Sequence, residues 1–231
     1  INLGSDTVCT DSKANQMASP LGADRWVVTI GKFAVNDLFD NNIFSHDPRV
    51  DFLNWAAIEA SAFDYAADAF GFTVGAAVER FRGGWVYRIG AFELSDVPNG
   101  TKLDAGQLRK FDHRSGGVLG LEWSFSENFG AFARVGASSG EVEAYDFTDV
   151  DRSMQGGISL GGALWHRSKD RVGVAILQND ISALRRRYFA AGGMGILVGD
   201  GKLPHPDREQ SLEAYYSAAI FDSVSLTLDL Q

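Results

Sequence analysis

The feature that most constrains the fold of this chain is an alternation of apolar and polar residues in segments joined by short turns. Positions 224, 226, 228 and 230 are Val or Leu, whereas positions 225, 227, 229 and 231 are Ser, Thr, Asp and Gln. A period of two belongs to a β-strand with one apolar and one wetted face. Residues 211–220 alternate in the same way, and only residues 221–223 separate the two segments. These segments therefore predict an antiparallel hairpin.

The same pattern recurs along the chain. Further pairs of predicted strands occupy residues 70–81 and 85–93, 119–125 and 129–135, and 156–165 and 171–178, and a single strand occupies residues 25–33. Each pair has a tight turn, and a longer polar connection leads to the next pair. Short turns at one end and long loops at the other are typical of an outer-membrane β-barrel.

Aromatic residues gather near the predicted short turns. In a membrane barrel they would form a girdle at the level of the lipid headgroups, whereas a soluble β-sandwich would place them in its core. The residues concerned are Trp85, Tyr87, Trp123, Phe125, Phe129 and Trp165.

Composition narrows the class of protein. The chain is 45% hydrophobic, yet its mean hydropathy is -0.09, and it has no apolar run long enough to cross a bilayer as a helix. A membrane protein of this sequence must therefore be a β-barrel. A net charge of -9 argues against nucleic-acid binding, which needs clustered cations. The single Cys9 and four scattered histidines supply no zinc ligand set, so we expect no metal and no cofactor.

The segment from residue 36 to residue 68 is too long and too rich in chemistry to be a passive turn. It carries carboxylates, amides, an arginine and aromatic rings between two predicted strands. A long loop of this kind, folded into a barrel, narrows the pore and selects solutes.

The order of motifs resembles the OprB-type carbohydrate-selective porins of bacterial outer membranes. The matching segments are Gly31 to Phe33, Asn36 to Asn42, Asp47 to Arg49, Phe52 to Trp55, Phe63 to Ala67, Gly195 to Gly201 and Glu213 to Tyr216. The resemblance covers residues 24–231, and residues 1–23 stay unassigned. It implies an all-β, antiparallel transmembrane β-barrel of sixteen strands, of which about nine or ten lie in this chain. We therefore expect either a partial sequence or a second chain that completes the barrel, and an assembly such as a homotrimer. A small barrel of about eight to ten strands is the remaining option, and its lumen would be too narrow for a sugar.

Two sets of residues are candidates for the site. Sugars are recognised by planar hydrogen-bonding groups and by aromatic faces. The loop and its preceding strand offer both, and the predicted pore constriction comprises Lys32, Asp37, Asp40, Asn41, Asn42, Asp47, Arg49, Asn54 and Trp55, with Phe39 and Phe44 as further aromatic faces. Charges opposite or near apolar stripes are predicted to line the pore: Glu79, Arg88, Glu122, Arg134 and Glu213.

A structural role remains open for part of the loop. Asn and Asp cap turns, so Asp40, Asn41 and Asn42 could shape the loop, and Arg49 could pair with Asp37 or Asp47.

The function that we expect is passive, selective diffusion of sugars and other small hydrophilic solutes across the bacterial outer membrane. The expected partners are small carbohydrates, outer-membrane lipid and lipopolysaccharide. Two alternatives stay open: an outer-membrane barrel that only serves as a scaffold, and a soluble all-β enzyme acting on carbohydrates. We expect no catalytic residues, because the acidic residues are spread over many strands instead of forming a pair in one cleft.

Overall fold

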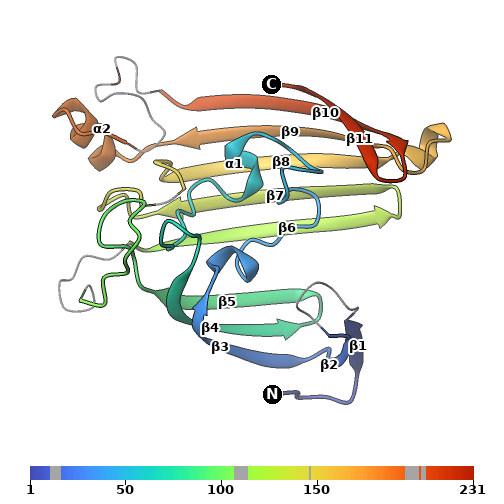
Figure 1. Ribbon diagram of the computed structural model, residues 1–231, viewed down its shortest axis with the longest axis horizontal. Coiled ribbons are helices and arrows are strands. Elements are labelled where there is room, and N and C mark those ends of the chain that lie inside the picture. Colours follow the sequence, from blue (N-terminus) through green and yellow to red (C-terminus); the bar gives the residue numbers. More distant parts are fainter. Residues whose placement is uncertain (11–16, 107–113, 146, 196–202, 204–206) are drawn as a thin grey trace.

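Three antiparallel sheets make up the fold (Figure 1). The computed structural model describes residues 1–10, 17–106, 114–145, 147–195, 203 and 207–231. The largest sheet has the order β11-β10-β9-β8-β7-β6, so each strand pairs with its neighbours in the chain. Its strands are β6 (Gly116–Ser126), β7 (Phe129–Ser138), β8 (Arg152–Gly161), β9 (Arg171–Asp180), β10 (Glu209–Phe221) and β11 (Val224–Leu230).

The remaining elements are short or precede this sheet. A three-stranded sheet contains β3 (Arg25–Phe33), β4 (Thr73–Arg82) and β5 (Trp85–Phe92), and a small sheet pairs β1 (Thr7–Thr10) with β2 (Ser19–Gly22). Helical segments are η1 (Val35–Asp37), α1 (Trp55–Ile58), η3 (Gly162–Trp165) and α2 (Ala183–Ala190).

The predicted hairpins are confirmed, with one correction. The pairs β4–β5, β6–β7, β8–β9 and β10–β11 all run antiparallel. The strand expected to extend to residue 165 ends at Gly161 instead, and Trp165 lies in the 3-10 turn η3. At Gly162 a Cβ atom would lie 2.0 Å from the Arg167 carbonyl oxygen, and His166 adopts the left-handed conformation with φ of 64°. This tight turn ends the strand.

The predicted all-β, antiparallel architecture is confirmed, but the described strands do not close into a barrel. β5 and β6 are edge strands of two separate sheets, and no strand pairing joins them in the part of the chain that the structure describes. A closed barrel of sixteen strands therefore stays a prediction.

The strands of the large sheet have one apolar and one polar face, because successive side chains point to opposite sides. On one face Ile176, Leu212 and Leu228 are exposed, together with the other leucines of β11. The opposite face buries polar side chains, among them Ser153, Gln155 and Asn179. Soluble monomers rarely expose an apolar area of this extent.

Several aromatic residues of the predicted girdle lie near the tight turns, whereas the girdle itself stays a prediction. The tight turns of β4–β5, β6–β7 and β10–β11 lie at one end of the molecule, and α2 lies at the other end (Figure 1). Trp85, Tyr87, Trp123 and Phe125 are exposed near these turns, and the rings of Phe125 and Phe129 stack with centroids 4.9 Å apart. Within the described residues, no helix is long and apolar enough to span a bilayer.

Candidate functional site

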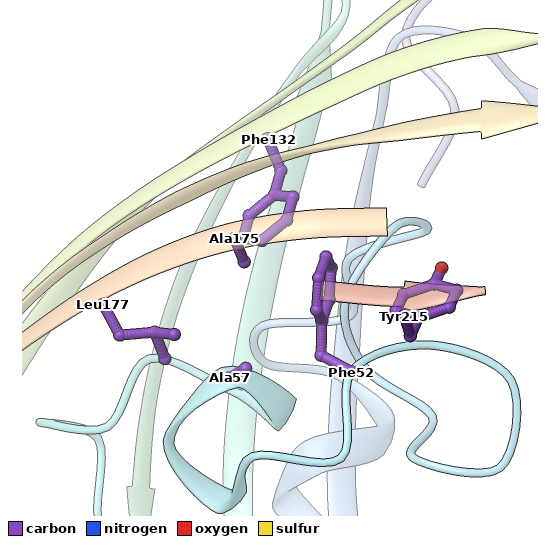
Figure 2. Close-up of a cluster of buried hydrophobic side chains, with 6 residues drawn as sticks. All are labelled: Phe52, Ala57, Phe132, Ala175, Leu177 and Tyr215. Atoms are coloured by element: carbon purple, nitrogen blue, oxygen red, sulfur yellow. The ribbon is translucent and has the colours of Figure 1, made fainter. Parts of the chain in front are cut away.

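The segment between β3 and β4, residues 34–72, lies against the polar face of the large sheet, and we call it the long loop. Its Phe52 and Ala57 pack on Phe132 of β7, on Ala175 and Leu177 of β9 and on Tyr215 of β10 (Figure 2). The Phe52 ring meets the Tyr215 ring edge-on, with centroids 5.1 Å apart. This small apolar cluster holds the middle of the long loop on the sheet, since burial of such rings is worth several kcal/mol.

Two charged side chains of the sheet bind the backbone of the long loop. Arg134 of β7 donates hydrogen bonds to the carbonyl oxygens of Ser45 and Ala57, the latter at 3.0 Å. Glu213 of β10 accepts hydrogen bonds from the backbone N–H groups of Leu53 and Asn54 at 2.5 and 3.0 Å. Buried charges persist where hydrogen bonds satisfy them.

Arg134 and Glu213 are buried beneath the long loop, which differs from their predicted position on a pore wall. Both were expected to line a solvated pore, but they are only 1% and 0% exposed. The long loop covers them, and they hold it on the sheet. Their position on the polar face is as predicted, whereas the loop that covers this face could not be inferred from strand periodicity.

A second contact surrounds Asp40. This residue has a positive φ of 55°, a conformation that Asp tolerates better than most residues. Its carboxylate forms an ion pair with Arg134, with Oδ1 2.8 Å from Nε, and accepts a hydrogen bond from the backbone N–H of Ala60. Burial raises the pKa of Asp40, although the positive charge of Arg134 opposes that shift. Asp40 thus closes the long loop on itself and on β7.

Glu59, which the sequence analysis did not select, lies beside this ion pair. Its side chain is buried, and the residue is 1% exposed. Burial, with the nearby charge of Asp40, raises the pKa of Glu59 to about 8. Because α1 is short and the surrounding residues are mostly small and apolar, no sequence pattern marks this glutamate as buried.

The remaining predicted wall charges form pairs or contact the long loop. Arg88 of β5 donates to Glu79 of β4 at 2.9 Å, and these residues are direct partners in the strand register. Glu122 of β6 is exposed and accepts a hydrogen bond from the backbone N–H of Ile43 at 3.0 Å. Lys32 of β3 pairs with Asp68 at 2.8 Å.

One cavity brings several predicted residues together. It has a volume of about 1080 Å³ and is bordered by the long loop, β5 and β6. The predicted site residues that line it are Asp40, Asn41, Asn42, Arg88 and Glu122. The aromatic residues Phe39 and Phe63 also line it. Carboxylate, amide and guanidinium groups beside aromatic faces are suited to a polyhydroxylated solute.

Other predicted residues lie away from this cavity. Asp47 and Arg49 form an exposed pair at 2.5 Å, which is one of the two pairings left open for Arg49. Asn54 caps α1 by accepting a hydrogen bond from the N–H of Ala56 at 3.0 Å, so its side chain shapes the loop. Asp37 is exposed and lies in η1.

Trp55 is the exposed aromatic residue of α1. The residue is 49% exposed, and its indole N–H donates to the Phe147 carbonyl oxygen at 3.0 Å. Its ring lies 5.2 Å from that of Phe147, which in turn lies 5.3 Å from the ring of Tyr65. By contrast, Phe39 stacks on Phe63 and Phe44 packs against the buried cluster, so both rings contact protein.

A network of buried charges joins the long loop to the other long connections. Asp64 accepts hydrogen bonds from the N–H groups of Tyr145 and Phe147, both at 2.7 Å. Arg185 of α2 lies 2.9 Å from Asp151 and 3.3 Å from Asp149. The sequence does not predict this network, because its members are dispersed over three connections and share no spacing.

Two expectations concern the glycine-rich segment and metal ligands. The glycine-rich segment from Gly195 to Gly201 lies outside the described residues beyond its first position. Among the described residues, no group of three or more acidic, histidine or cysteine side chains could hold a metal ion.

A protein-family model matches part of the chain. Residues 122–231 match the family model described as "Carbohydrate-selective porin, OprB family". This range runs from within β6 to the last residue and contains both Arg134 and Glu213. Neither a curated protein nor a solved structure matches the chain. The resemblance of residues 24–121 to the same family therefore stays a prediction, as does the assignment of residues 1–23.

Proposed function

We propose, from the match of residues 122–231 to the carbohydrate-selective porin family, that this chain forms part of an outer-membrane channel for passive diffusion of sugars and other small hydrophilic solutes. Such a family assignment implies a transport channel instead of an enzyme. The exposed apolar face of the large sheet would contact lipid, and the polar face would border the channel.

The observation that carries the proposal beyond the family match is the attachment of the long loop to the polar face. Buried anchors in β7 and β10 fix this loop at Ser45, Leu53, Asn54 and Ala57. A segment fixed across the inner face of a channel reduces its bore and presents its own side chains to solutes. The long loop is therefore the proposed constriction.

The proposed solute contacts are of two kinds. Asn41, Arg88 and Glu122 line the large cavity and supply hydrogen-bonding groups. Trp55 offers an exposed aromatic face on which the C–H surface of a sugar ring would stack. Weak binding, with a dissociation constant on the order of millimolar, suits a channel from which the solute must also leave.

Single-channel recording with sugar titration tests this function. The protein in a planar lipid bilayer should conduct ions, and added sugar should reduce the current in a saturable manner. A silent bilayer would support the scaffold alternative, and sugar cleavage in the chamber would support the enzyme alternative. A conducting channel that no sugar affects would reject selective sugar diffusion.

A further inference from the structure

We propose that Glu59 is a proton-dependent latch, which holds the long loop on the large sheet while its carboxyl group is neutral and weakens this attachment when it ionises. Its consequence for transport rests on the proposed function, because it assumes that the long loop narrows the channel. The latch itself is a property of the loop and can be tested without any solute.

The first observation is the incomplete hydrogen bonding of the Glu59 carboxyl group. Its Oε2 atom is buried without a hydrogen-bond partner among the described residues, and Asn36 supplies one hydrogen bond to the carboxyl group. The backbone carbonyl of Glu59 accepts a hydrogen bond from the Gln155 side chain at 2.8 Å, which fixes the residue against β8. A buried carboxylate with a free oxygen is costly, whereas a neutral carboxyl group is tolerated.

The second observation is the arrangement of charges around Glu59. Arg134 faces it from β7 but already forms the 2.8 Å ion pair with Asp40. Asp40 itself faces Glu59 from the long loop and repels its negative form. His46 of the long loop interacts electrostatically with Asp40, and Glu122 of β6 interacts electrostatically with Arg134. Ionised Glu59 would thus place a second carboxylate beside the Arg134–Asp40 ion pair, in which the positive and negative charges already cancel.

The direction of the pH effect follows from these contacts. Burial first, and Asp40 second, raise the pKa of Glu59 from its ordinary value of 4.5 to about 8 while the loop is attached. When the loop is released into water, the pKa returns toward 4.5. Glu59 therefore stabilises attachment fully below about pH 4.5. Between pH 4.5 and pH 8, the equilibrium constant for loop attachment falls by up to about tenfold for each pH unit. A rise in pH from about 4.5 to about 8 therefore favours release.

Thiol labelling measures this release directly. Ser45 of the long loop is fully buried, and Cys9 is exposed. The S45C variant in a C9S background places one protected thiol at the attached segment. Maleimide labelling rates would be compared with and without Glu59→Gln at each pH, so that the pH dependence of the thiol itself cancels in the ratio.

The latch predicts a change in one ratio, the labelling rate with Glu59 intact divided by the rate in the Glu59→Gln variant. This ratio should rise at least about tenfold between pH 6 and pH 9. The same ratio at both pH values would overturn the proposal. Glu127→Gln in the exposed β6–β7 turn serves as the matched control and should leave the pH dependence intact, as should His46→Gln. Because Asn36 lowers the pKa of Glu59 in the attached loop, Asn36→Ala should extend the rise in labelling to higher pH.

Conductance separates this latch from the proposed function. If labelling shows release and sugar-dependent block is present at pH 6, the current should rise and the block should weaken at pH 9 unless Glu59 is replaced by Gln. Labelling alone decides the latch, whereas absence of sugar block at every pH would reject the proposed function and leave the labelling result standing.

Discussion

Glu213 and Asn54 are separated by 159 positions in the sequence, yet the Glu213 carboxylate accepts a hydrogen bond from the Asn54 backbone N–H at 3.0 Å. The neighbouring N–H of Leu53 binds the other carboxylate oxygen. One strand side chain thus satisfies two successive donors at the start of α1. This relationship turns a predicted pore charge into a structural anchor.

Loss of this anchor should loosen the long loop. In Glu213→Ala, two backbone N–H groups lose their acceptor, at a cost of roughly 1–3 kcal/mol for each group that stays buried. We expect faster trypsin cleavage at the exposed Arg49 and a larger, noisier single-channel current. Glu213→Gln keeps one acceptor oxygen and should show a smaller effect. Cleavage and current equal to wild type in Glu213→Ala would contradict the anchoring role.

Removal of one partner of the Arg134–Asp40 pair should be more costly than removal of both. Arg134→Met leaves a buried carboxylate and two loop carbonyls without their donor, so we expect a loss of about 3–5 kcal/mol in stability. Asp40→Asn in the same protein should restore part of it. Urea unfolding of the single and double variants measures the coupling. Additive losses in the double variant would show that the two residues do not interact.

Trp55 should contribute to sugar binding without contributing much to stability. Trp55→Ala removes an aromatic face worth about 0.5–1.5 kcal/mol, which corresponds to a roughly 2- to 10-fold weaker sugar block. Trp55→Phe should retain most of the block. The Arg49→Ala variant, measured in the same sugar-block assay, tests whether the exposed Asp47–Arg49 pair contributes to sugar binding. Unchanged block in Trp55→Ala and Arg49→Ala would remove both residues from the constriction.

Glu122 should influence which ions pass. It is an exposed carboxylate beside the large cavity, so in the proposed channel its charge would act on solutes in a way that the covered Glu213 could not. Glu122→Gln should shift the reversal potential in a salt gradient toward lower cation preference. Glu127→Gln, in the exposed turn of the same hairpin, should leave the reversal potential unchanged. Equal shifts for both variants would indicate a general surface-charge effect.

The sequence predicts the strands well because their signal is local. Alternation of side chains and short turns are properties of a few neighbouring residues, and they place β10 and β11 within a few positions. The end of β8 was missed because close packing at Gly162, not periodicity, ends that strand. Tertiary contacts decide such boundaries.

The candidate site is less predictable for the same reason. Composition marks the long loop as special, but it does not tell which polar side chains face solvent. Asn41 and Asn42 both line the cavity, but the Asn42 side chain accepts a hydrogen bond from the loop backbone, as does that of Asn54. The burial of Arg134 and Glu59 depends on a loop from one part of the chain covering strands from another. Contacts between residues so far apart in the sequence produce no local sequence pattern from which they could be predicted.

The distance in sequence between Asn54 and its anchor also constrains the order of folding. The long loop precedes β4 in the chain, but its attachment needs Arg134 from β7 and Glu213 from β10. Contacts between such remote segments form late and slowly, because a large loop must close first. We therefore expect the long loop to reach its final position only after β10 has joined the sheet, so that the proposed constriction forms last.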